Sequence, residues 1–221
     1  MHINNNFQGI QMFKIFTLAL AFFLYPLSVN AAQYVEGKHY SVVSPQKSNK
    51  QELREYFSFY CPACRGFEPY VADFKKGLPT GATLEKTHVD FMGHTSPEIQ
   101  FMLGKALILA EKSGIAHRFT PAMFKYLQTD RATISSEKDV RNIFVLSGGN
   151  GDTFDKSINN FSIVSQAKRN KKTQDRLSNA RQLTSVPSFL VNGKYLINTK
   201  ALDQKNMIQD YKNIIAYLFT L

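Results

Sequence analysis

Apolar and polar positions near residue 60 predict a strand that runs directly into a helix. Residues 53–60 (LREYFSFY) are rich in aromatic side chains and are typical of a buried strand. Four apolar residues then recur at helical spacing and would form one helix face: Phe67, Tyr70, Val71 and Phe74. The chain therefore changes from strand to helix at the residues between these two patterns.

A hairpin is predicted much further along the chain. Two runs rich in β-forming residues, 188–191 and 194–197, flank the dipeptide Asn192-Gly193. An Asn-Gly pair between two such runs indicates a type I′ turn. Pro187 stands at the entrance of the first run, where its peptide bond can be cis or trans.

The residues between these two regions carry helical patterns. We expect helices at 97–112 and 121–128, and a third that starts after Ser136, with Asp139 completing a capping box, and ends near Gly148. A long polar helix should follow over 163–182. One apolar face defines a last helix: Met207, Tyr211, Ile214, Ile215 and Leu218. These patterns require a helical insertion within a βαβ and ββα frame.

The N-terminus reads as a signal peptide over residues 1–31. Residues 15–27 form a run that is free of charge and almost entirely apolar, too short to span a membrane but typical of the core of a signal peptide. Val29 and Ala31 supply the small residues needed for cleavage after Ala31. An uncleaved anchor is the alternative, and translation can start at Met1 or Met12.

Charge adds little to this picture. The 221 residues carry a formal net charge of +10, and 43% of them are apolar, which suits one domain, or one domain with an insertion. Six basic residues give the long helix a basic face: Lys168, Arg169, Lys171, Lys172, Arg176 and Arg181. Without a nucleic-acid motif in an exported chain, we interpret this face as solvated and expect no nucleic-acid partner.

The two cysteines, Cys61 and Cys64, point to redox chemistry. They close a loop too short to stabilise a fold much, so a purely structural disulfide is disfavoured. A C-x-x-C motif can also be half of a zinc site, but zinc needs further ligands, and the five histidines are scattered without ligand spacing. We therefore expect no metal.

The predicted position of the motif explains why it would react. Cys61 should lie at the N-terminus of the helix, where free N–H groups and the helix dipole favour a thiolate. Pro62 suits the first helical position. Cys64, one turn further, should be shielded and act as the resolving thiol.

Several segments together resemble one family across residues 32–218. These segments are AAQYVEGKHY, FSFYCPAC, HVDFMG, TSVPSFLVNGKY and the last helix. They resemble the DsbA family of periplasmic thiol:disulfide oxidoreductases. The resemblance implies an α/β thioredoxin fold with an inserted helical domain: residues 32–92 and 184–221 would form the thioredoxin-like domain, and residues 93–183 the inserted helical domain with the long connecting helix.

The resemblance also implies roles for individual residues. Cys61 would be the nucleophile, Cys64 its buried partner and Pro187 a cis-proline beside the disulfide. Val186 would bind a substrate strand through its backbone, next to Pro62 and Ala63. Three charged residues would lie beneath the site: Glu55, Glu68 and Lys86. By pattern alone Glu55 could instead lie on a strand edge or the solvent face.

Ala63 departs from the family pattern, because the best-known members have histidine there. A cationic imidazole would help to hold the Cys61 thiolate. We therefore expect a higher Cys61 pKa and a weaker oxidant than in a histidine-bearing relative.

The predicted function is the donation of the Cys61–Cys64 disulfide to reduced exported proteins in the periplasm. The disulfide itself would carry the electrons, so no further cofactor is expected. A DsbB-like membrane quinone reductase would reoxidise the protein, which we expect to be a monomer. The alternatives are a disulfide isomerase or reductase, a peptide-binding chaperone with a structural C-x-x-C, and a metal carrier.

Overall fold

A computed structural model describes residues 34–221 of the chain, so the predicted signal peptide lies outside the described residues. A sheet forms the centre, with its strands in the order β1-β5-β4-β2-β3. The strands are β1 (Tyr40–Val42), β2 (Glu52–Phe57), β3 (Thr83–His88), β4 (Ser188–Val191) and β5 (Tyr195–Ile197). β2 pairs parallel with β3 and antiparallel with β4, so β2 lies in the interior of the sheet.

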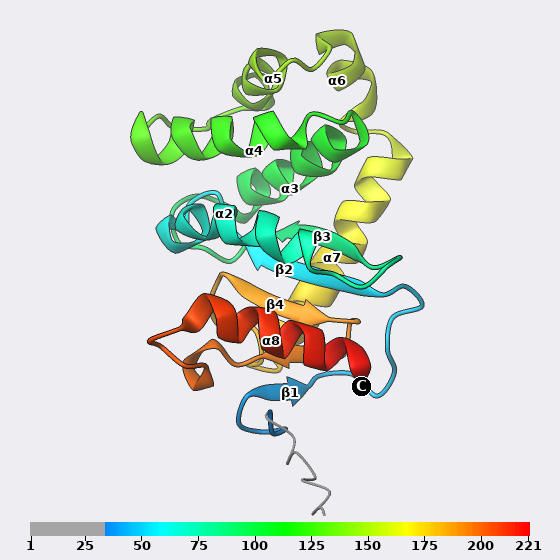
Figure 1. Ribbon diagram of the computed structural model, residues 1–221. Helices are drawn as coiled ribbons and strands as arrows, with labels where there is room; N and C mark the ends of the chain where they lie inside the picture. Colours follow the sequence, from blue (N-terminus) through cyan, green and yellow to red (C-terminus); the bar gives the residue numbers. More distant parts are fainter. Residues whose placement is uncertain (1–33) are drawn as a thin grey trace, which may run out of the picture. The chain divides into compact units, whose positions relative to one another are not determined.

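Helices cover both faces of this sheet (Figure 1). α2 (Pro62–Lys76) and α8 (Met207–Thr220) lie on one face, and α7 (Phe161–Asn179) packs on the other. The strands alternate accordingly. Leu53 packs with α2 and α8, whereas Tyr56 packs with Leu177 of α7. A short 3₁₀ turn, η3 (Thr199–Ala201), precedes α8.

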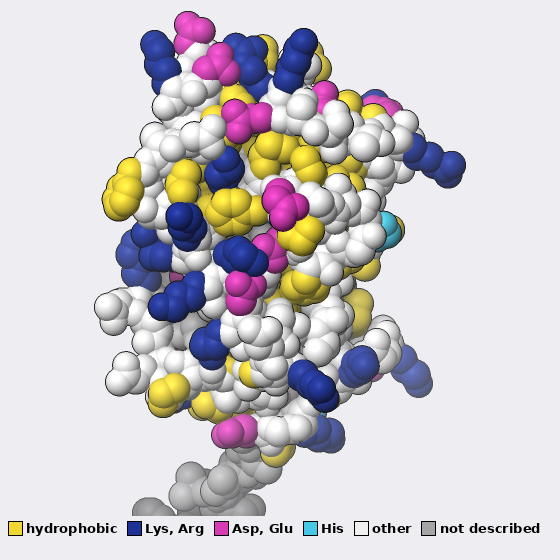
Figure 2. Space-filling view, turned by 180° about the vertical axis from the view of Figure 1, so that it is seen from behind, with side chains coloured by type: hydrophobic (Ala, Val, Ile, Leu, Met, Phe, Trp, Pro, Cys, Tyr) yellow, Lys and Arg dark blue, Asp and Glu magenta, His cyan; other side chains and the backbone are white. Residues whose placement is uncertain are grey.

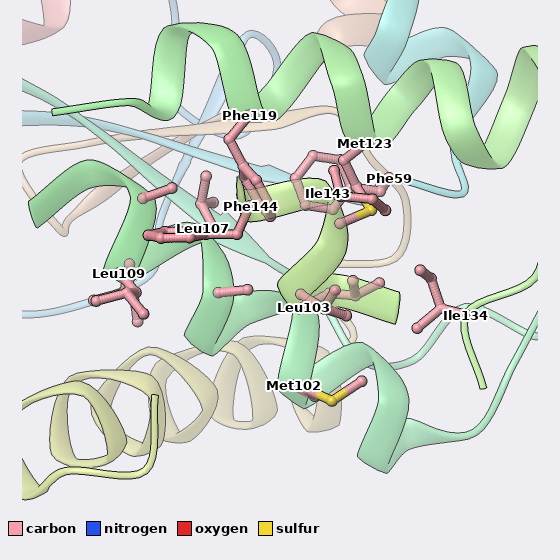
Figure 3. Close-up of a cluster of buried hydrophobic side chains, with 14 of the residues drawn as sticks. Phe59, Met102, Leu103, Leu107, Leu109, Phe119, Met123, Ile134, Ile143 and Phe144 are labelled. Carbon is pink, nitrogen blue, oxygen red and sulfur yellow. The ribbon is translucent and has the colours of Figure 1, made fainter. Parts of the chain in front are cut away.

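The remaining helices stack beyond β3 (Figure 1). They are α3 (Pro97–Lys112), α4 (Ala116–Phe124), the π-helical turn η2 (Lys125–Thr129), α5 (Glu137–Leu146) and α6 (Gly151–Ser157). Their shared core contains Phe119, Met123 and Phe144, and Phe59 enters it from the loop after β2 (Figure 3). The Phe59 ring centroid is 5.1 Å from that of Phe124. The loop that carries the cysteines is thus anchored in the helical core.

The α/β thioredoxin fold with a helical insertion is confirmed. Residues 97–179 hold the helices α3 to α7, and the strands of the described sheet all fall within residues 40–88 and 188–197. The domain boundaries at residues 92, 93, 183 and 184 stay a prediction. None of the helices in residues 34–221 combines the length and the apolar character that a membrane span needs.

Several local predictions hold. The helix at 97–112 has the predicted bounds, and Ser136 and Asp139 form the capping box of α5. Asn192 and Gly193 have φ angles of 51° and 64°, as a type I′ turn requires. The strand predicted over 53–60 ends at Phe57 instead, because the backbone turns at Ser58, whose carbonyl accepts from the Cys61 N–H at 3.0 Å.

The helix predicted at 121–128 is wrong in its start and in its type. α4 begins at Ala116, and Pro121 lies inside it rather than at its first position. Burial of Phe119, Met123 and Phe124 holds the helix together despite the missing proline N–H. The π-helical turn η2 follows, and the short helix α6 has no counterpart in the predictions. The long helix runs over Phe161–Asn179 rather than 163–182, because the Asn160 side chain caps its start.

Candidate active site

The strand-to-helix turn places Cys61 at the N-cap of α2. Its Sγ accepts a hydrogen bond from the backbone N–H of Cys64 at 3.1 Å, and Pro62 occupies the first turn of the helix. Both cysteines are free thiols in this structure. Cys61 retains 5% of its surface exposed and Cys64 none, so only Cys61 offers a path to another molecule.

The two thiols have opposite acidities. A hydrogen bond from the Cys64 side chain, together with backbone N–H groups of Cys64 and Ala63, lowers the pKa of Cys61 to about 7 against the opposing effect of burial. The hydrogen bond to Cys61 and burial raise the pKa of Cys64 above its ordinary value, and the charge of Glu55 adds to this. Near neutral pH, Cys61 is therefore the more acidic thiol and Cys64 stays protonated.

A second loop, distant from Cys61 in the sequence, borders the site. The peptide bond between Val186 and Pro187 is cis, and the Cys61 thiol donates to the Val186 carbonyl at 3.5 Å. Val186 and Pro187 are both partly exposed, and Pro62 and Ala63 are exposed. The loop of Val186 and Pro187 therefore meets the exposed start of α2 at Cys61.

Strand pairing explains the buried charges beneath the cysteines. Glu55 and Lys86 are direct neighbours in the parallel pair of β2 and β3, and Lys86 Nζ lies 2.9 Å from Glu55 Oε2. Glu68 of α2 also forms an ion pair with Lys86. The side chain of Glu55 is fully buried, so the alternative of a strand edge or solvent face is wrong.

This ion triad leaves Glu55 poorly compensated. Oε1 of Glu55 has no hydrogen-bond partner among residues 34–221. Burial raises the pKa of Glu55 to about 7, and Lys86 opposes the rise. Burial also lowers the pKa of Lys86, but Glu55 and Glu68 outweigh it, so the pKa of Lys86 is raised overall. The carboxyl group of Glu55 is therefore protonated more readily than that of an exposed glutamate.

Gln128 belongs to the site although no sequence pattern indicated it. Its side-chain amide in η2 donates to the carbonyls of Phe59 at 2.8 Å and Cys61 at 3.1 Å. These bonds tie the helical layer to the cysteine loop. Gln128 stood at the end of a predicted helix, where a polar residue is unremarkable, so no local signal could have identified it.

His88 is the second residue without an assigned role. It is buried at the end of β3, and its Nε2 accepts the backbone N–H of Phe59 at 3.0 Å. Burial lowers the pKa of His88 to about 3, so the ring is neutral at physiological pH. It supports the cysteine loop as an acceptor and carries no charge toward the thiols. Its only sequence signal was membership of the HVDFMG segment.

Metal ligation has no support in the described part of the chain. Within residues 34–221, no three His, Cys, Asp or Glu side chains are grouped so that they could hold a metal ion. The chemistry that the geometry offers is thiol–disulfide exchange: an acidic thiol lies at a helix N-terminus, beside a shielded partner thiol.

Comparison with known proteins agrees with this geometry. The family model of the DSBA-like thioredoxin domain matches residues 52–209. The thiol:disulfide interchange protein DsbA of Yersinia pestis is 32% identical over 209 residues, which cover 92% of this chain and 97% of that protein. The DsbA of Salmonella typhimurium is 35% identical over 207 residues, covering 91% and 96%.

Solved structures show the same fold. A DsbA from Proteus mirabilis with a non-covalently bound peptide superposes with a TM-score of 0.75 at 26% identity, over 86% of this chain and all of that one. The DsbA of Klebsiella pneumoniae gives a TM-score of 0.74 at 27% identity over the same shares. Together with the paired thiols of Cys61 and Cys64, these matches show that the chain belongs to the DsbA family and is a thiol:disulfide oxidoreductase.

Proposed function

We propose that this protein is a periplasmic disulfide donor that passes its Cys61–Cys64 disulfide to reduced, newly exported proteins. The observation that carries the proposal is the Cys61 sulfur at the N-cap of α2, 3.1 Å from the Cys64 N–H and with a pKa of about 7. A thiolate that is stabilised in the reduced protein makes the corresponding disulfide more oxidising.

The reaction has two exchange steps. A substrate thiolate attacks Cys61 Sγ of the oxidised protein, the Cys61–Cys64 bond breaks, and Cys64 leaves as a thiolate that takes up a proton. A second substrate thiolate then attacks the substrate sulfur of the mixed disulfide and expels the Cys61 thiolate. The substrate loses two electrons and gains a disulfide, and the protein gains the two electrons as a dithiol.

Four residues around the thiols are assigned to substrate binding and positioning. Val186 offers its backbone to an extended substrate strand, Pro187 shapes the loop that presents it, and Pro62 and Ala63 contact the substrate beside Cys61. The partial exposure of the Val186–Pro187 loop supports this assignment. So does the peptide bound to the Proteus mirabilis relative.

Three charged residues are assigned to tuning the thiols. Glu55 is fully buried and its charge raises the pKa of Cys64, which favours the protonated resolving thiol. Lys86 holds the carboxylate of Glu55 in place and is itself paired with Glu68. The role follows from Coulomb interactions across a poorly solvated interior.

The cellular setting completes the proposal. A signal peptide over residues 1–31, cleaved after Ala31, would direct the chain to the periplasm, where disulfides persist. A DsbB-like membrane quinone reductase would reoxidise the dithiol. The protein would act as a monomer without a further cofactor.

Equilibration of the Cys61–Cys64 pair with glutathione tests the direction of electron flow. A donor has a reduction potential well above that of the glutathione couple, and a potential near about −270 mV, as in thioredoxin, would make the protein a reductant instead. A second assay follows the oxidation of a reduced two-cysteine peptide. Cys61→Ser should abolish turnover. If the wild type binds the peptide as well as Cys61→Ser does but shows no turnover, the protein is a chaperone instead.

A further inference from the structure

A cavity of about 450 Å³ opens on the α7 face of the sheet, and none of the residues assigned to the thiol chemistry lines it. Its walls come from β2, β4, α7 and the loop around residue 46. Four cationic side chains line it: Lys47, Arg54, Arg169 and Arg176. Glu52 is the acidic residue in the lining, so the cavity walls carry an excess of positive charge. Lys and Arg side chains also gather over α7 on the face seen in Figure 2.

Tyr56 supplies the floor of this cavity. Its side chain is fully buried, and its hydroxyl has no hydrogen-bond partner among residues 34–221. A buried hydroxyl without a partner is destabilising, because it has given up its hydrogen bonds to water. Burial raises the pKa of Tyr56 to about 12, with Arg54 and Arg176 acting in the opposite direction, so the hydroxyl is protonated and available as a donor. A ligand in the cavity that offers an acceptor could therefore take a hydrogen bond from Tyr56.

Arg54 is held in a fixed orientation and keeps N–H groups that no residue of the described chain accepts from. Its Nε and Nη2 donate to Glu52 at 3.2 and 3.0 Å, and its Nη1 donates to Thr87 at 2.9 Å. A guanidinium has five N–H groups, so two remain. Because the Arg54 side chain is only 17% exposed, little conformational entropy is lost when it binds a ligand.

α7 adds two further guanidinium groups from one helix face. Arg169, Thr173 and Arg176 follow one another at helical spacing and all line the cavity. Arg176 is positioned by a hydrogen bond from its Nη1 to the Val43 carbonyl at 2.7 Å. Arg169 has no ion pair within the described residues. From the sequence we interpret the basic face of this helix as solvated. That interpretation misses that Arg169 and Arg176 line a cavity together with other hydrogen-bond donors.

We propose that this cavity binds a phosphate group, carried either by a soluble phosphate compound or by a phospholipid headgroup. Guanidinium groups pair with phosphate oxygens through two parallel hydrogen bonds, and several guanidinium groups suit the tetrahedral set of phosphate oxygens better than the two oxygens of a carboxylate. The Tyr56 hydroxyl donates to a further oxygen. The volume exceeds that of one phosphate and admits an organic group attached to it.

Calorimetric titration of the folded protein with inorganic phosphate at constant ionic strength tests the site. We expect saturable binding and a rise in melting temperature that chloride does not reproduce. Tyr56→Phe should weaken phosphate binding by about tenfold, because one hydrogen bond to a charged acceptor is lost. Its melting temperature without phosphate should not fall, since the hydroxyl has no protein partner.

Arg169 is exposed, so Arg169→Gln should fold like the wild type. This variant should weaken phosphate binding several-fold. Lys156→Gln on α6 removes the same charge away from the cavity and should bind phosphate like the wild type. Equal effects of phosphate and chloride, or equal phosphate affinity of the wild type, Tyr56→Phe and Arg169→Gln, would overturn the proposal.

Sedimentation with vesicles separates the two sources of phosphate. Binding to phosphatidylcholine vesicles that contain phosphatidylglycerol, displaced by inorganic phosphate and weakened by Arg169→Gln, assigns a lipid headgroup. Saturable phosphate binding without sedimentation assigns a soluble phosphate compound. Absence of both overturns the site.

Discussion

The side-chain amide of Gln128 donates to the carbonyl of Cys61 across the boundary between the helical layer and the sheet, at 3.1 Å. A second bond from the same amide reaches the carbonyl of Phe59 at 2.8 Å. Gln128 in the π-helical turn η2 thus holds two backbone carbonyls of the loop that carries the reactive Cys61 thiol. The position of the Cys61 thiol therefore depends on the helical insertion.

Gln128→Ala should lower the free energy of unfolding by about 1–2 kcal/mol, because two partly buried carbonyls lose their donor. Urea unfolding of the reduced protein measures the change. Gln182→Ala, an exposed glutamine, should stay within about 0.5 kcal/mol of the wild type. Equal stability of both variants would show that solvent replaces the Gln128 bonds at no cost.

The acidity of Cys61 should depend on the side chain at position 64. The absorbance of the thiolate near 240 nm should titrate with a midpoint of about 7 in the reduced wild type. Cys64→Ala removes the largest cause of the lowered pKa, so the midpoint should rise toward the ordinary value of 9.0. Cys64→Ser keeps a hydrogen-bond donor and should fall between the two. An unchanged midpoint in Cys64→Ala would assign the effect to backbone N–H groups alone.

The same shift links the stability of the reduced protein to pH. Because the pKa of folded Cys61 lies below its value of 9.0 in the unfolded chain, the thiolate stabilises the folded state fully above about pH 9. This contribution is lost as the pH falls through about 7.

Lys86→Met should destabilise the protein by about 3–5 kcal/mol at pH 8, because it leaves the buried charge of Glu55 without its partner. The pKa of Glu55 is raised above its ordinary value of 4.5 to about 7, so its penalty is present above pH 7 and disappears as the pH falls toward 4.5. Removal of Lys86 raises this pKa further. Denaturant unfolding should therefore show a smaller loss at pH 5 than at pH 8.

Two variants control this result. Lys76→Met breaks an exposed pair with Asp73 and should cost less than about 0.5 kcal/mol. The double variant Glu55→Gln with Lys86→Met should recover part of the loss, since position 55 then carries no buried charge. A loss that is the same at pH 5 and pH 8 would contradict the role of the Glu55 charge.

Ala63→His should make the protein a stronger oxidant. Ala63 is exposed and adjacent to Cys61, so an imidazolium there would stabilise the thiolate and lower the pKa of Cys61 by about one unit. About 1.4 kcal/mol in favour of the reduced state corresponds to a reduction potential about 30 mV higher. Equilibration with glutathione measures it, and Ala63→Gln, polar but uncharged, should leave the potential unchanged. A potential that does not rise in Ala63→His contradicts the expectation drawn from the departure at this position.

The features that could be predicted from the sequence are those determined by residues close to one another in the chain. The N-cap position of Cys61 and the turn at Asn192 follow from neighbouring residues, and both are confirmed. Pro121 misled because a proline usually marks the first turn of a helix, whereas here tertiary burial of its neighbours overrides that preference. The pair of Glu55 and Lys86 required the register of two strands that are separated by α2.

Gln128 and Tyr56 show the limit of local patterns. The amide of Gln128 matters through backbone carbonyls of residues that lie 67 and 69 positions earlier in the chain. Tyr56 alternates normally within its strand, and only the arrangement of α7 above it shows that its hydroxyl has no partner. Neither residue type nor spacing encodes such long-range contacts.

The contact between Cys61 and the Val186 carbonyl joins residues 125 positions apart. A ribosome delivers the N-terminal residue first, so both cysteines leave it long before β4 exists to pair with β2. Until that pairing occurs, the nascent chain carries two thiols that the loop of Val186 and Pro187 does not yet cover. While it is being made, this catalyst of disulfide formation is thus a chain whose own two thiols are uncovered and can attack the disulfides of other molecules.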